Sequence, residues 1–147
     1  MEPTHTIRDI VQKFLEDHVK MVLSLNEEGE YPNTSLMHYA ADKSLYLHFG
    51  TKRAFTKYNA LKKDPRVSLV VVEESIDPLR VVSMRGLARE LTGDAAEIAL
   101  LLFKTENHSK WYMEGASDLA MFQIKPTSIR WQDATSGELI ANTINLQ

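Results

Sequence analysis

The chain has 147 residues, a net charge of −3 and no cysteine. This length suits one domain with a sizeable core, and the lack of cysteine excludes disulfides and thiolate metal sites. The balance of 20 acidic against 17 basic residues argues against a general nucleic-acid binder. Apolar runs are too short to span a membrane, and the first residues lack the apolar core of a signal peptide. We therefore expect one cytoplasmic domain over residues 1–147, with no nucleic-acid or membrane partner.

The chain opens with a predicted helix. Thr6 can cap it, and Asp9 stands three residues later in a variant of the capping box. The apolar residues that follow recur at helical spacing and predict one buried face: Ile7, Ile10, Val11, Phe14 and Leu15. His18 extends this stripe and is predicted to lie at the end of the packed face. Alternating apolar residues then predict a strand over 19–25.

Two strands, 33–40 and 44–50, flank a short polar connection and are predicted to form a hairpin. A basic helix follows, and Pro65 ends it because proline disfavours helical geometry at the preceding residue. A nearly continuous apolar strand is predicted over 66–74. The alternating stretch 79–92 predicts a longer strand, in which Gly86 permits a bend or bulge.

The remaining chain predicts a helix over 95–104 and two short strands within 119–133, separated by Pro126. No element is assigned beyond Gly137. Strands mostly follow one another, with helices inserted between them, which is typical of an antiparallel α+β barrel and not of a doubly wound parallel sheet. The common glycine-rich nucleotide loops are absent.

The segment from Thr51 to Lys63 holds five basic residues and no acidic one. It lies where a strand leads into a helix, and a helix N-terminus attracts anions through unpaired N–H groups and its dipole. Thr51 and Thr56 add hydroxyl donors, while Arg53 and Lys57 add positive charge. This pattern favours a single phosphate group as the ligand. The alternative is a solvated helix face, which is the simpler reading of Lys62 and Lys63 near the helix C-terminus.

The sequence resembles a known family, the pyridoxamine 5′-phosphate oxidase-like proteins, which are FMN-binding split barrels. The resemblance covers roughly residues 6–133, and the order of the matching elements carries it. Those elements are Pro32, Leu45-Tyr46-Leu47, Thr51, Thr56-Lys57, Asp64-Pro65-Arg66-Val67, Gly86-Leu87-Ala88 and the closing strands at 122–131.

The resemblance implies a six-stranded antiparallel split β-barrel with flanking helices, and a homodimer with FMN at the subunit interface. It implies that Thr51, Thr56 and Lys57 bind the FMN phosphate, with Arg53 as an additional phosphate contact. It places the flavin ring along two strands, at Asn33, Thr34, Ser35, Leu36 and Met37 and at Phe49 and Gly50. Trp131 matches a region of partner-chain contacts, although a core position is a close alternative.

Several residues depart from the true pyridoxamine 5′-phosphate oxidases. Asn33 stands where they have an arginine, Thr56-Lys57 replaces an Arg-Lys pair, and an apolar residue near Val81 replaces a glutamine. The C-terminal extension that binds their substrate is missing from a chain that stops at Gln147. We therefore expect an FMN-dependent oxidoreductase that passes a hydride or electrons from a reduced nicotinamide to an unidentified small acceptor. No catalytic side chain is identified.

Two other functions remain open. One is a non-catalytic flavin- or haem-binding sensor or carrier, for which His38, His48 or His108 could ligate haem iron. The other is a deazaflavin-dependent reductase of the same fold. The five histidines lack paired ligand spacing, so no metal site is predicted, although His38 and His48 could be neighbours across the predicted hairpin.

Overall fold

The computed structural model describes residues 6–75, 77–106 and 118–146. The helices in these ranges are α1 (Ile7–Glu16), α2 (Thr56–Lys63) and α3 (Gly93–Glu106). The strands are β1 (Lys20–Leu25), β2 (Asn33–His38), β3 (Ala40–Ala41), β4 (Leu47–Lys52), β5 (Arg66–Val72), β6 (Arg80–Glu90), β7 (Leu119–Asp133) and β8 (Ile140–Asn145). None of the helices within these ranges is long and apolar enough to cross a membrane.

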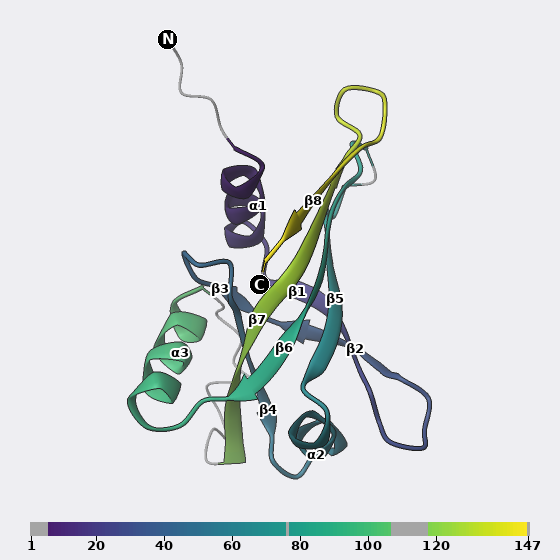
Figure 1. The fold of residues 1–147 in the computed structure, drawn as a ribbon. Coiled ribbons are helices and arrows are strands. Elements are labelled where there is room, and N and C mark those ends of the chain that lie inside the picture. The colour runs from purple at the N-terminus through teal and green to yellow at the C-terminus, as the bar shows by residue number, and fades with distance from the viewer. Residues whose placement is uncertain (1–5, 76, 107–117, 147) are drawn as a thin grey trace.

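The strands form one antiparallel sheet in the order β2-β1-β5-β6-β7-β4-β3, with β8 added to β7. The sheet curls into a half-barrel around a single main core, with the three helices outside it or at its end (Figure 1). The predicted α+β antiparallel architecture is therefore correct. The six strands that the resemblance implies are too few, because the described ranges contain eight, including the short β3 and β8.

The predicted hairpin of 33–40 with 44–50 is only partly correct. Residues 33–38 pair with β1, from Leu25↔Asn33 to Lys20↔His38, and only Ala40 and Ala41 pair with β4. The chain changes partner at Tyr39, which is fully buried. The Tyr39 N–H donates to Val19 O at 2.9 Å, and its hydroxyl donates to Leu15 O at 2.8 Å. One bent segment thus connects the two ends of the sheet.

This change of partner leaves two strand edges open. No strand in the described ranges pairs with β2 on the side away from β1. Residues 49–52 of β4 pair with β7 on one side and with no described strand on the other. The two strands diverge from β3, and α2 lies beyond the end of β4, in contact with β1, β4 and β6 (Figure 1). The sheet is therefore not closed by strand pairing between β2 and β4 in the described ranges.

The helices are stabilised by local capping and by their buried apolar faces. In α1, Thr6 Oγ1 accepts from the Asp9 N–H and the Asp9 carboxylate accepts from the Thr6 N–H, which confirms the capping box. Its buried side chains are Val11, Phe14 and Leu15, as predicted. α2 buries Ala60 and Leu61 in the main core, whereas α3 packs through Ala99 and Phe103 in a second cluster against β7.

Strand β7 is continuous, where two short strands were predicted. Its first part pairs with β4 up to Ile124, and its last part pairs with β8 from Ser128 onward. Pro126 lies in the gap between these partners, at an edge position where a missing N–H is tolerated. Opposite it, the β6–β7 register shifts between Arg85 and Gly86, which confirms the bulge expected at Gly86.

Gly86 is expected to be intolerant of a side chain. A Cβ there would lie 2.6 Å from Lys125 O, a backbone atom that cannot move aside. We expect Gly86→Ala to lower the free energy of unfolding by about 1–3 kcal/mol, measured by urea denaturation. Gly50→Ala is the matched control, because the atoms nearest to its Cβ would belong to the movable side chain of Leu119, and it should cost less. Equal losses in both variants would contradict the role of the close backbone approach.

Candidate functional site

The end of β4 and the start of α2 form the segment for which an anion was predicted. Thr51 is 1% exposed, and its Oγ1 is buried without a hydrogen-bond partner. α2 begins at Thr56, and its N-cap residue, Phe55, supplies no side-chain hydrogen bond. Lys57 makes no ion pair with any described residue, and Thr56 is exposed. The segment therefore offers a hydroxyl, the N-terminal N–H groups of a helix and a positive charge, which together suit a phosphate.

Arg53 is already engaged within the protein. Its Nη2 lies 3.1 Å from Glu90 Oε2, and its Nη1 donates to Leu119 O at 3.2 Å. The Ala54 N–H donates to Asp118 Oδ2 at 3.3 Å, so the turn before α2 is fixed to the start of β7. To help bind a phosphate, Arg53 would have to share its donors with Glu90.

Glu90, on β6, accepts hydrogen bonds from the turn before α2 and from α2 itself. Its side chain is 9% exposed and also accepts from the Tyr58 hydroxyl at 2.8 Å and from Lys62 Nζ at 3.2 Å. Burial alone would raise the pKa of the Glu90 carboxyl, but Tyr58, Lys62 and Arg53 together hold that pKa below its ordinary value. Sequence reasoning missed Glu90, because its partners are 28 to 37 residues away in the chain.

The predicted ring-binding residues of β2 lie along the open edge of this strand. Asn33 donates to Glu27 Oε1 at 2.9 Å, while Asn33 Oδ1 and Ser35 Oγ are buried without hydrogen-bond partners. Thr34 shares a hydrogen bond with Ser24 on the opposite face, where Leu36 is 64% exposed. Met37 is buried in the main core.

The predicted residues of β4 are less accessible. Phe49 is in the core and stacks on Phe122, with ring centroids 5.5 Å apart. Gly50 is buried, and the Leu119 side chain fills the space above its Cα. Trp131 is also buried and packs edge-on against Phe14, with ring centroids 5.0 Å apart. The close approach of a ligand to Gly50 would therefore require Leu119 to move.

The two candidate haem ligands within the described ranges lie on different strands. His38 is opposite Lys20 on β1, whereas His48 lies on β4, with its Nε2 2.9 Å from Asp42 Oδ2. His108 lies outside the described residues. Within the described ranges no group of three or more His, Asp or Glu side chains could hold a metal ion.

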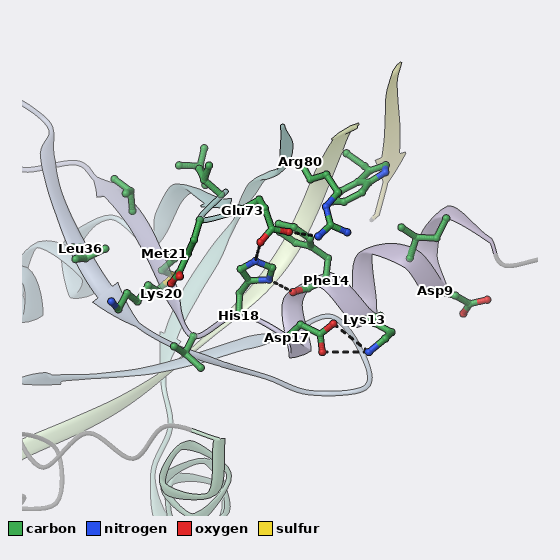
Figure 2. A pocket seen from close by; sticks show the side chains of 17 residues that line it. Asp9, Lys13, Phe14, Asp17, His18, Lys20, Met21, Leu36, Glu73 and Arg80 are labelled. Carbon is green, nitrogen blue, oxygen red and sulfur yellow. Dashed lines mark hydrogen bonds and ion pairs between the residues drawn. The ribbon is translucent and has the colours of Figure 1, made fainter. Parts of the chain in front are cut away.

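Sequence reasoning also missed a cavity of about 690 Å³ between α1 and strands β1, β5 and β6 (Figure 2). A chain of polar contacts runs along its wall. His18 Nε2 lies 3.3 Å from Glu73 Oε1, and Arg80 Nη2 is paired with Glu73 Oε2. Burial alone would raise the pKa of the Glu73 carboxyl, but Arg80 and His18 hold that pKa below its ordinary value. Glu73 is thus part of a connected network of polar side chains.

A model of the pyridoxamine 5′-phosphate oxidase family matches residues 7–133. The chain belongs to the pyridoxamine 5′-phosphate oxidase family. No curated protein matches the chain.

Solved structures of low sequence identity resemble this member of the pyridoxamine 5′-phosphate oxidase family. A heme-binding protein from Mycobacterium smegmatis has a TM-score of 0.78 and 19% identity, covering 97% of this chain and 60% of that one. A putative pyridoxamine 5′-phosphate oxidase from Listeria innocua has a TM-score of 0.70 and 22% identity, covering 86% and 98%. A FAD-binding protein from Mesorhizobium loti has a TM-score of 0.71 and 19% identity, covering 90% and 97%. These likenesses confirm the split-barrel fold. The chain spans 60% of the length of the Mycobacterium protein.

Replacing Glu90 should destabilise the protein in a pH-dependent way. We expect Glu90→Gln to lower the free energy of unfolding by about 1–3 kcal/mol at pH 7, because it weakens three hydrogen bonds to a carboxylate. Since the native-state pKa is lowered, this stabilisation is present above the ordinary carboxyl value of 4.5 and is lost as the pH falls below it. Urea denaturation at pH 7 and pH 4 measures both effects. Glu97→Gln, at an exposed position on α3, is the control; a pH-independent difference between wild type and Glu90→Gln would contradict this account.

Proposed function

We propose that this protein binds FMN, with the phosphate at the start of α2. The observation that carries the proposal is the buried, unpartnered hydroxyl of Thr51, next to a helix N-terminus that no side chain caps. Buried polar groups are nearly always hydrogen-bonded in folded proteins, so an unpartnered hydroxyl at this position favours a ligand. Thr56 and Lys57 would supply further donors to the same phosphate.

The flavin ring would lie along the open edges of β2 and β4. Asn33 Oδ1 and Ser35 Oγ are buried acceptors without partners on β2, and a flavin ring carries groups that can use them. FMN would supply the redox chemistry, and the residues of this chain would anchor its phosphate and orient its ring. We infer from this an oxidoreductase that passes a hydride from a reduced nicotinamide to a small acceptor.

A second copy of the chain would complete the site. Thr56 is exposed in the single chain, and the outer edge of β2 has no strand partner in the described ranges, so one chain leaves part of a bound flavin in contact with water. A homodimer with FMN at its interface would cover this side. The proposal also keeps the cytoplasmic location that the sequence predicts.

Haem is the second candidate ligand, favoured by the similarity to the Mycobacterium heme-binding protein. A haem would need a histidine with a free ring nitrogen. The Nε2 of His48 lies beside Asp42 Oδ2, and Asp42 Oδ1 accepts from the N–H groups of Ser44 and Tyr46. Ligation through Nε2 would break this contact, and the unpartnered Nδ1 is buried, so the geometry supports a flavin better than a haem ligated by His48.

Lys57 provides the test of the phosphate site. We expect Lys57→Ala to weaken FMN binding about ten- to a hundredfold, through loss of a charge-assisted hydrogen bond, and to leave riboflavin binding unchanged because riboflavin has no phosphate. Fluorescence titration of the flavin-free protein with each ligand measures both affinities.

Lys63→Ala is the matched control, because Lys63 is on the same helix but in its last turn. It should leave both affinities unchanged. A wild-type protein that takes up no FMN would overturn the cofactor proposal. Equal effects of the two substitutions on FMN binding would overturn only the placement of the phosphate.

A further inference from the structure

We propose that Asn33 accepts a hydrogen bond from the imide N–H of the flavin ring, and that Glu27 positions Asn33 for this contact. The imide is the N3–H group between the two carbonyls of the ring's pyrimidine edge. This inference rests on the flavin proposed above, and it names the part of the ring that β2 recognises. It also assigns a role to Glu27, a residue outside the strand that acts only through Asn33.

Asn33 and Ser35 lie on the inner face of β2. Side chains alternate between the two faces of a strand, and Met37, two residues beyond Ser35, is buried in the main core. Thr34 and Leu36, on the other face, are exposed. Asn33 Oδ1 and Ser35 Oγ are therefore buried on the core side of a strand whose outer edge has no partner in the described ranges.

Glu27 determines which atom of the Asn33 amide is turned to the interior. The Asn33 Nδ2 donates to Glu27 Oε1 at 2.9 Å. A carboxylate only accepts hydrogen bonds at neutral pH, so the amide presents its NH₂ group to Glu27 and its oxygen to the interior. The backbone of Glu27 is itself held, because its carbonyl accepts from the Glu30 N–H at 3.1 Å. The buried atom of the Asn33 amide is therefore an acceptor.

A buried acceptor without a donor favours a ligand that supplies an N–H group. Leaving such an atom unpaired is unfavourable, so the site gains most from a ring that donates to Asn33 Oδ1. The ring system of an oxidised flavin has a single N–H, which is at N3. The carbonyl oxygens beside N3 can accept from a hydroxyl, and Ser35 supplies one on the same face of β2. An acceptor and a hydroxyl side by side therefore match the imide edge, which a haem does not have.

The Glu27 carboxylate has no competing partner within the described ranges. Lys63, Asp64 and Arg66 line the same hollow as Glu27. Arg66 pairs with Asp64 at 2.8 Å, and neither cation forms an ion pair with Glu27 in the part of the chain that the structure describes. The hydrogen bond to Asn33 is thus the contact that the Glu27 side chain makes, and it fixes the amide orientation.

N3-methyl-FMN tests the inference, because it keeps the phosphate and the ring but has no N3–H. We expect fluorescence titration of the flavin-free protein to show FMN binding at least about tenfold more tightly than N3-methyl-FMN, a difference of about 1.4 kcal/mol. Glu27→Lys should weaken FMN binding about tenfold and change N3-methyl-FMN binding less than about twofold, because a lysine only donates and would turn the Asn33 oxygen away from the ring. Glu28→Lys, the same charge change at an exposed neighbour, should leave both affinities unchanged.

A second variant covers the case in which Glu27→Lys disturbs the turn before β2. Asn33→Leu removes the acceptor itself and should also weaken binding of FMN but not of N3-methyl-FMN. A wild-type protein that binds no FMN would overturn the proposed function on which this inference rests. Binding of FMN without a preference over N3-methyl-FMN, or a preference that survives both Glu27→Lys and Asn33→Leu, would overturn this inference alone and leave the flavin site in place.

Discussion

The fold depends on the change of strand partner at Tyr39. The residues before it pair with β1, at one end of the sheet, and the residues after it pair with β4, at the other end. Burial raises the pKa of the Tyr39 hydroxyl, so it stays protonated and donates to Leu15 O at the end of α1. One buried residue thus lies between the two ends of the sheet, and its side chain holds this point against the first helix. The open edges of β2 and β4 are a direct consequence.

The features proposed to bind a flavin follow from this geometry. β4 ends at Lys52, and α2 begins four residues later at Thr56, so the helix N-terminus is fixed close to the buried Thr51. Glu90 fixes α2 against β6 through Tyr58 and Lys62, and it fixes the preceding turn through Arg53. A rigid support of this kind would hold the phosphate-binding groups in place without taking part in any chemical step.

Local signals in the sequence predicted much of this fold. The capping box at Thr6, the apolar strand predicted over 66–74 and the bulge at Gly86 each depend on neighbouring residues, and each is present, although the strand ends at Val72. The partner change at Tyr39 was missed because alternation in a strand has the same period whichever strand it pairs with. The contact of His18 with Glu73 was missed because it joins residues 55 positions apart, and the mostly polar β8 gave no apolar pattern. The ordered resemblance to a family, and not any single motif, led to the proposed flavin site.

The absorption spectrum of the protein purified without added cofactor tests the central claim most directly. The account predicts the two visible absorption bands of an oxidised flavin, either in the purified protein or after addition of FMN and removal of the excess. The released chromophore should be FMN when it is identified by mass. A single intense haem band, or a colourless protein that retains no FMN, would contradict the assignment of the split between β2 and β4 as a flavin site.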